Sequence, residues 1–263
     1  MKRYSKDKGR IYMTDGRYTL GVVSVSFRGY SPKEIIKAAA NANLSVIEWG
    51  SDVHAPASDR EALRRIAALQ SEYGITTSSY GSYFRLGVNG LSELYSYAEA
   101  ARLLGTDIIR VWCGNKSGAD MTKDERKSLI DECKGAAKIA EECGVILCTE
   151  CHRATFTEMR EDAVFLMNEV ASQGFRTYWQ PFQWQSHEEN LLNAEALSPY
   201  ATHLHVFNWR DSEKLPLADA VEDWQKYLKK FDTPRTLLLE FMPNDGIDEL
   251  KAEADALRKI IGE

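Results

Sequence analysis

The chain has 263 residues, of which 44% are hydrophobic and 27% charged, a balance that excludes collagen-like, low-complexity and disordered proteins. Its net charge is −6, from 33 basic and 39 acidic residues, and the one dense basic cluster is the first seventeen residues. We interpret this cluster as a solvated leader and not as a nucleic-acid-binding stripe. The longest apolar run, near residues 108–113, is interrupted by Arg110 and is far shorter than the roughly 20 residues that span a bilayer. No apolar segment follows the basic start, so we expect no signal peptide and a cytoplasmic location.

The five cysteines indicate free thiols, because their number is odd and no secretory signal precedes them. Cys148 and Cys151 have the CxxC spacing of redox and zinc motifs. They lie in a strand-like stretch, however, where alternation directs positions three apart to opposite faces. We therefore favour structural thiols over a redox pair.

From residue 19 onward the chain repeats one unit: a short β-branched or aromatic run, a polar loop, and an amphipathic helical stretch. Ser31 and Pro32 start the first helix as N-cap and first-turn residues, and Gly74, Gly105 and Gly144 end later ones. The predicted strands are 19–24, 45–49, 75–79, 108–112, 145–150, 176–180, 203–207 and 236–241. The first predicted helix starts at residues 31–32. The other seven are 58–73, 91–104, 122–143, 158–172, 188–197, 218–230 and 248–261.

Eight strands that alternate with eight helices predict parallel strands joined by right-handed crossovers. An open doubly wound sheet would carry a glycine-rich phosphate loop after its first strand, but VVSVSFRGYSP contains no GxGxxG. We therefore predict a single (β/α)8 TIM barrel over residues 19–263, preceded by the leader at residues 1–18, with no linker and no second domain.

In this fold the active site lies at the carboxyl ends of the strands. The last four predicted strands end with Glu150, Gln180, His205 and Glu240. Any one of these residues alone would be interpreted as a partner in a structural interaction, but four in register predict a shared site. Oxygen and nitrogen ligands of this kind suit Mn²⁺, Mg²⁺, Zn²⁺ or Co²⁺.

The segments around these residues resemble a known family. The motifs ECHRATFTE, YWQPFQ, HLHVFNW and LLEFMP, together with EWGSDVHAP after the second strand, are similar to the sugar phosphate isomerase/epimerase group of the xylose isomerase-like TIM barrels. The resemblance covers roughly residues 19–262.

The resemblance implies a divalent metal, preferably Mn²⁺, held by Glu150, Gln180, His205 and Glu240. It also implies that the two glutamates are the catalytic acid/base pair, which moves a proton next to a sugar carbonyl. The sequence departs from the family pattern in two places: Gln180 replaces an aspartate, and Gln183 replaces a histidine. Both are neutral amides, so we expect divalent affinity to be lower than with the usual ligands.

Several side chains near the strand ends are candidates for substrate binding. His152 shares the face of Glu150 by strand alternation, and Arg210 lies five residues after His205, where it can pair with a hydroxyl or phosphate. Aromatic residues at strand ends suit the apolar faces of sugars. The predicted substrate-binding residues are His152, Gln183, Arg210, His54 and Trp112.

The leading hypothesis is a metal-dependent sugar or sugar phosphate isomerase or epimerase that acts through an enediolate. The alternatives are a lyase or dehydratase acting on a keto-sugar, including C-glycoside cleavage, and a non-catalytic sugar-binding barrel that has lost the metal. Zinc-dependent cleavage of DNA is disfavoured, because the chain has five histidines and a negative charge. We expect a small carbohydrate as partner, and neither nucleic acid nor membrane. The particular sugar and the oligomeric state stay open, a homodimer being the commonest assembly.

Overall fold

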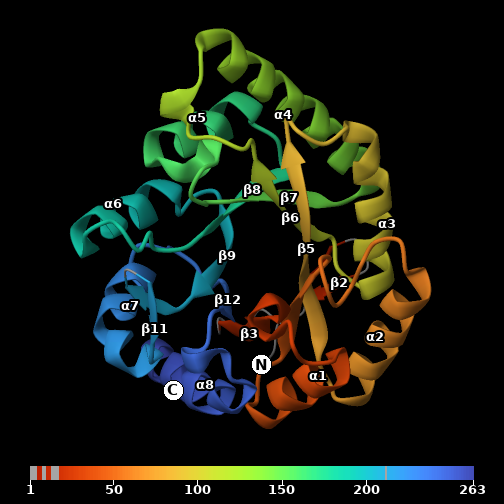
Figure 1. Ribbon diagram of the computed structural model, residues 1–263, viewed down its shortest axis with the longest axis vertical. Coiled ribbons are helices and arrows are strands. Elements are labelled where there is room, and N and C mark those ends of the chain that lie inside the picture. The colour runs from red at the N-terminus through yellow and green to blue at the C-terminus, as the bar shows by residue number, and fades with distance from the viewer. Residues whose placement is uncertain (1–4, 8–9, 13–17, 211) are drawn as a thin grey trace.

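The computed structural model describes residues 5–7, 10–12, 18–210 and 212–263. Its central feature is a closed barrel of parallel strands in the order β12-β3-β4-β5-β6-β7-β8-β9, ringed by helices (Figure 1). The predicted (β/α)8 barrel is confirmed. The barrel strands are β3 (Thr19–Val23), β4 (Val46–Gly50), β5 (Thr76–Leu86), β6 (Ile108–Cys113), β7 (Ile146–Glu150), β8 (Phe175–Trp179), β9 (Ala201–Val206) and β12 (Thr236–Leu239).

Local signals in the sequence set the ends of the outer helices. Ser31, Thr122 and Ser186 each form a capping box with the glutamate three residues later. The helices are α1 (Pro32–Asn41), α2 (Arg60–Glu72), α3 (Leu94–Leu104), α4 (Lys123–Cys143), α5 (Arg160–Val170), α6 (His187–Leu197), α7 (Val221–Leu228) and α8 (Leu250–Ile261). Short 3-10 turns lie at η1 (Ser24–Phe27), η2 (Leu91–Glu93), η3 (Gly118–Asp120), η4 (Phe156–Glu158), η5 (Leu217–Ala220), η6 (Pro243–Asp245) and η7 (Ile247–Glu249).

Three elements differ from the sequence-based expectation. Strand β5 continues to Leu86, well past the predicted end at residue 79, and its pairing with β6 shifts register between Gly81 and Arg85. A hairpin of β10 (Asn208–Arg210) and β11 (Glu213–Leu215) follows β9. The segment interpreted as a leader contains the antiparallel pair β1 (Ser5–Asp7) and β2 (Arg10–Tyr12), and its other positions up to residue 17 lie outside the described residues.

The interior of the barrel is layered. Side chains two residues apart on a strand point to the same side, so Cys148 and Glu150 both point inward from β7, as do Leu238 and Glu240 from the end of β12. An apolar cluster within the barrel consists of Val23, Val25, Val46, Cys148, Tyr178 and Leu238, and the buried His203 stacks on Tyr178 with ring centroids 5.0 Å apart. The next layer towards the carboxyl ends is polar. A packed apolar layer thus supports the polar groups at the end of the barrel where barrel enzymes act.

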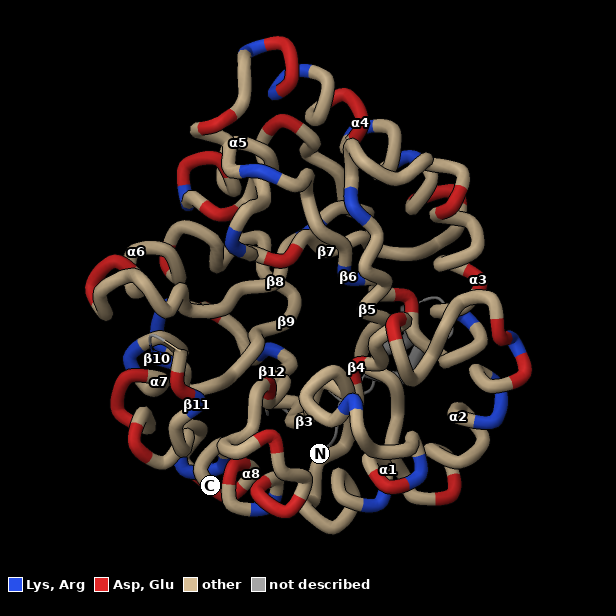
Figure 2. The backbone as a smooth tube through the Cα atoms, in the orientation of Figure 1, with Lys and Arg blue, Asp and Glu red and all other residues tan. Residues whose placement is uncertain are grey.

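The distribution of surface charge and the state of the cysteines match the expectations from the sequence. Figure 2 shows residues of both charges spread over the outer helices, and no helix in the described ranges is long and apolar enough to cross a membrane. All five cysteines are free, as predicted. Burial raises the pKa of the Cys148 and Cys151 thiols to about 12, which keeps both protonated and poorly reactive.

Candidate active site

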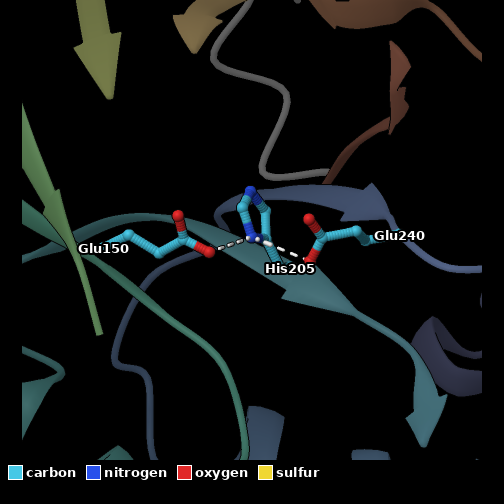
Figure 3. Close-up of side chains that lie close together, drawn as sticks. All are labelled: Glu150, His205 and Glu240. Carbon is cyan, nitrogen blue, oxygen red and sulfur yellow. Dashed lines mark ion pairs between the residues drawn. The ribbon is translucent and has the colours of Figure 1, made fainter. Parts of the chain in front are cut away.

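Four strand ends bring their polar side chains to one point inside the barrel mouth, and Figure 3 shows three of them, Glu150, His205 and Glu240. Ligand atoms of Glu150, His205 and Glu240 all lie within 4.8 Å of one another, and all three residues are buried. His205 Nδ1 is 3.2 Å from Glu240 Oε2 and 3.6 Å from Glu150 Oε1. Gln180 Oε1 lies 2.9 Å from the same nitrogen, while its Nε2 donates a hydrogen bond of 3.0 Å to the carbonyl of Cys151. The structure therefore brings together the four residues predicted from the strand ends.

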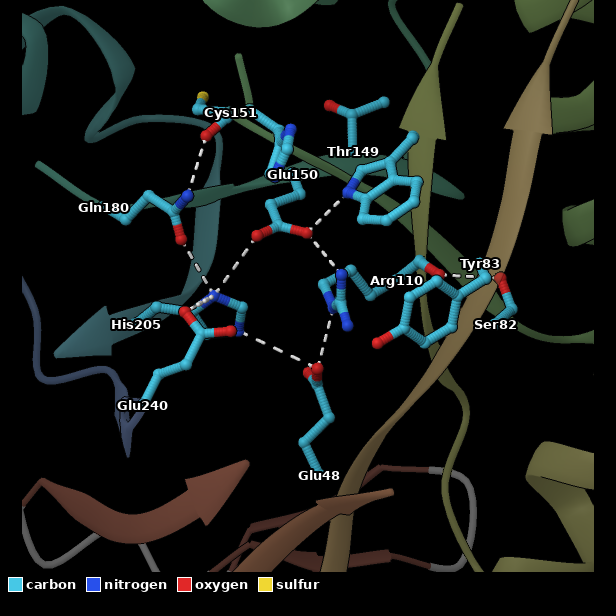
Figure 4. A network of polar contacts seen from close by, with 12 residues as sticks. Glu48, Ser82, Tyr83, Arg110, Thr149, Glu150, Cys151, Gln180, His205 and Glu240 are labelled. Carbon is cyan, nitrogen blue, oxygen red and sulfur yellow. Dashed lines mark hydrogen bonds and ion pairs between the residues drawn. The ribbon is translucent and has the colours of Figure 1, made fainter. Parts of the chain in front are cut away.

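Two further charged residues belong to this layer and were not predicted as site residues. Arg110 Nε donates to Glu48 Oε1 at 2.7 Å, and Arg110 Nη1 donates to Glu150 Oε2 (Figure 4). Trp112 Nε1 also donates to Glu150 Oε2, at 2.7 Å. The available sequence signal was a charge within an apolar strand: Glu48 lies between Ile47 and Trp49, and Arg110 interrupts the longest apolar run.

The buried charges stabilise one another. Burial is the largest influence on the pKa of Glu48 and Glu150 and opposes their ionisation, but Arg110 and His205 together outweigh it. Both carboxyl pKa values therefore lie well below the usual range. Burial likewise opposes protonation of His205, yet Glu240, Glu150 and Glu48 raise its pKa well above the usual value. The carboxylates thus create a negative potential that favours a cation at the position of the imidazole.

The donor set fits a divalent cation. Glu240 Oε2 is buried and has an ion-pair contact with His205 Nδ1 but no hydrogen bond to any described residue, although buried polar atoms without hydrogen bonds are costly. Three oxygens, from Glu150, Gln180 and Glu240, surround His205 Nδ1, a combination that suits Mn²⁺, Mg²⁺, Zn²⁺ or Co²⁺. Glu150, His205 and Glu240 could hold a metal ion, and the amide oxygen of Gln180 lies beside them.

Glu150, Gln180 and Glu240 line a cavity of about 700 Å³, within the range of small-molecule sites, and His205 is buried behind them. Aromatic residues form much of its wall, and two of them, Tyr83 (φ 57°) and Phe241 (φ 60°), have left-handed backbone conformations. Bulky residues seldom adopt this region, and such strain clusters at ligand-binding sites. The lining includes Val25, Arg28, Tyr83, Trp112, His152, Arg153, Gln183, Trp184, Trp209 and Phe241.

The five predicted substrate-binding residues do not all reach this cavity. His152, Gln183 and Trp112 line it, and the rings of His152 and Trp112 are 5.1 Å apart. Arg210 lines a neighbouring cavity of about 400 Å³, with its guanidinium 3.8 Å from Asp223. His54 is buried, with Nε2 3.2 Å and 3.1 Å from the carbonyls of Phe27 and Tyr30. These contacts connect it to the segment before α1, and His54 does not line the cavity.

A closed eight-stranded barrel with a polar centre at the strand carboxyl ends defines the chain as a TIM-barrel protein of the type that carries active sites at this face. The family model described as xylose isomerase-like TIM barrel matches residues 36–260, and the chain belongs to this family. The resemblance drawn from the strand-end motifs is thereby confirmed.

Individual relatives are distant. A 3-dehydroshikimate dehydratase of Bacillus anthracis is 20% identical over 271 residues, covering 92% of this chain and 96% of the relative. Among solved structures, the probable 3-DHS dehydratase AsbF of B. anthracis superposes with a TM-score of 0.77 at 18% identity, over 92% of this chain and 98% of AsbF. IOLI protein with a bound zinc atom gives 0.75 at 15% identity, and D-psicose 3-epimerase of Clostridium cellulolyticum H10 with D-tagatose gives 0.64 at 14%, each over 92% of this chain and 98% of the other. At these identities the structures show a shared fold.

Proposed function

We propose that the protein is a divalent-metal-dependent isomerase or epimerase that moves a proton at a carbon next to a carbonyl of a carbohydrate substrate. The observation that carries the proposal is the convergence of Glu150, Gln180 and Glu240, which line the 700 Å³ cavity, around the buried His205. A proton next to a carbonyl is removed by a positioned base. Two carboxylates on either side of one imidazole supply a group to take the proton and a group to return it.

The residues of the chain have distinct tasks in this chemistry. Glu150 accepts from Arg110 and Trp112 through Oε2, which fixes its carboxylate, while Glu240 Oε2 faces His205 Nδ1 at 3.2 Å and lines the cavity that would hold the substrate. When bound, the metal supplies electrostatic stabilisation of the negative charge that develops on the substrate oxygens. Trp112 and Tyr83 on the cavity wall exclude water from the reacting carbon and offer faces to a sugar ring.

Similar proteins support both this proposal and its alternative. D-psicose 3-epimerase with D-tagatose and a D-allulose 3-epimerase of Methylomonas with D-allulose share the fold, which favours the epimerase. The match to 3-dehydroshikimate dehydratase over 92% of the chain favours a dehydratase as the second candidate. Both reactions begin with removal of a proton next to a carbonyl. In the epimerase reaction a proton returns to the same carbon. In the dehydratase reaction the substrate loses the hydroxyl group of the neighbouring carbon as water.

The test is incubation of the protein with Mn²⁺ and a panel of ketoses in D₂O, followed by NMR and mass spectrometry. We expect deuterium at the carbon next to the carbonyl, and Glu150→Gln and Glu240→Gln should each reduce turnover at least 10²-fold, as is typical for a lost general base. Glu72→Gln, an exposed change on α2, is the control.

Different outcomes separate the readings. Exchange that survives in both glutamine variants would assign the proton transfer to another group, such as His152. Loss of water instead of epimer formation would favour the dehydratase. No exchange with any ketose, together with no binding of Mn²⁺, would contradict the proposal and favour a sugar-binding barrel.

A further inference from the structure

The two oxygens of Glu150 have different partners. Oε1 faces the cluster, 3.6 Å from His205 Nδ1. Oε2 faces away from it and accepts hydrogen bonds from Trp112 Nε1, at 2.7 Å, and from Arg110 Nη1. The carboxylate is therefore held in one orientation, with one oxygen occupied and the other directed at His205, as Figure 4 shows.

Arg110 is itself held from behind. Its Nε donates to Glu48 Oε1 at 2.7 Å, and Glu48 Oε2 accepts from Ser79 Oγ at 2.8 Å. The side chains of Arg110 and Glu48 are 4% and 0% exposed, so neither is free to turn towards solvent. This series of side-chain hydrogen bonds runs from Ser79 on β5 through Glu48 and Arg110 to Glu150 on β7, inside the barrel.

Gly81 provides the space for this guanidinium. A Cβ at position 81 would lie 2.7 Å from Arg110 Nη2 and 3.2 Å from Glu48 Oε1. The backbone of Gly81 is not left-handed, so conformational freedom does not explain the glycine. Close approach of the charged pair does, because any side chain at this position would displace it.

Fold stability does not account for such an arrangement. Replacing buried ion pairs by apolar residues of similar volume is often neutral or stabilising, and Arg110 and Glu48 lie at the face of the barrel that carries active sites. The Glu48–Arg110 pair has another use, because Arg110 donates a hydrogen bond to Glu150. Groups that are hydrogen-bonded to metal ligands orient those ligands and tune the affinity for the metal.

We infer that Arg110, anchored by Glu48 in the space left by Gly81, is a positioning residue that restricts Glu150 to presenting Oε1 alone to the cation site. The inference rests on the proposed function for the role of that site. A carboxylate can bind a divalent cation through one oxygen or through both. With Oε2 occupied by Arg110 and Trp112, Glu150 would offer only Oε1 to a bound cation.

The sharpest variant keeps every charge. Gly81→Ala adds one methyl group in the space of the guanidinium and should displace Arg110 from Glu150. We expect the dissociation constant for Mn²⁺, measured by calorimetry, to rise about tenfold, the lower end of the effect of losing such a supporting contact. Gly29→Ala is the matched control, because no atom lies within 4 Å of a Cβ there, and it should bind Mn²⁺ as the wild type does.

A second variant removes the pair without changing net charge. Glu48→Gln/Arg110→Met takes away one negative and one positive group, and should weaken Mn²⁺ binding in the same direction. Its control is Arg126→Met/Asp162→Asn, which removes the ion pair between α4 and α5 outside the cavity. A purely structural role would lower the melting temperature of both double variants and leave Mn²⁺ affinity unchanged in both.

A crystal structure of the Gly81→Ala protein provides a readout that does not depend on metal. The inference predicts that the Glu150 carboxylate turns away from its single-oxygen orientation. An unchanged Glu150, or wild-type Mn²⁺ affinity in folded Gly81→Ala and Glu48→Gln/Arg110→Met proteins, would overturn it. If the wild type binds no Mn²⁺, the proposed function fails, and the orientation of Glu150 in the variant still decides the inference.

Discussion

Gln180 determines how much negative charge surrounds the candidate cation site. Its amide is fixed by the hydrogen bond to Cys151, with Oε1 2.9 Å from His205 Nδ1, so it contributes an oxygen but no charge. Glu150 and Glu240 are the carboxylates among the four converging residues. A third one would add to the attraction for a divalent cation at this point.

We therefore expect Gln180→Asp to tighten binding of Mn²⁺ at least tenfold, or about 1.4 kcal/mol, in a calorimetric titration. Gln183→Glu, which places the same charge on the cavity wall outside the cluster, should have a smaller effect. Binding by the variant alone would indicate that the natural protein has given up the metal. If neither protein binds, the assignment of these four residues to a metal is wrong.

The residues of the cluster differ in how far sequence alone could reveal them. Glu150, Gln180, His205 and Glu240 end strands, and strand alternation is local information. The role of Arg110 is not local, because its partner Glu48 lies 62 positions away along the chain. Only closure of the barrel brings Glu48 to Arg110 and Arg110 to Glu150, so the sequence reveals an unexplained charge in each strand but not the partner of that charge.

Helix α5 ends on a left-handed residue that is not glycine. Ala171 has φ 48° and ψ 39°, and its N–H donates to the carbonyl of Met167. At the same position α3, α4 and α8 carry Gly105, Gly144 and Gly262. A Cβ in this conformation is strained, and glycine avoids the strain.

Ala171→Gly should therefore raise the free energy of unfolding by about 1 kcal/mol, as measured by urea denaturation. Gly144→Ala is the converse change and should lower it by a similar amount. A lower stability for Ala171→Gly would mean that the alanine methyl contributes packing that outweighs the backbone strain.

At the scale of elements, periodicity predicted each barrel strand but not the details that shape the cavity. The predicted third strand ends at residue 79, yet β5 continues to Leu86 through a register shift with β6, and Tyr83 in this extension lines the cavity. The β10–β11 hairpin is also short and polar, and it gives no apolar repeat. The extension of β5 pairs with β6, more than twenty residues later in the chain, and a local pattern does not encode that contact.

The molecule as a whole closes by pairing β12 with β3, residues 236–239 with 19–22, so α8 packs beside the start of the barrel. Glu253 on α8 is buried there, with its two oxygens 3.1 Å and 3.2 Å from the backbone nitrogen of Leu217. Burial, opposed by this hydrogen bond and assisted by Glu249 and Asp219, raises the pKa of Glu253 to about 7.

The stability of the barrel should therefore depend on pH through Glu253. Between its unfolded pKa near 4.5 and its folded value of about 7, the folded state binds a proton that the unfolded state releases, so the free energy of unfolding falls as pH rises. Glu253→Gln cannot ionise and should be the more stable protein at pH 8, by about 3 kcal/mol at most, since each unit of pKa difference is worth about 1.4 kcal/mol. Urea denaturation at intervals from pH 5 to pH 8 should show the two stability curves separating as pH rises. Parallel curves would show instead that the hydrogen bond from Leu217 keeps Glu253 ionised throughout this range.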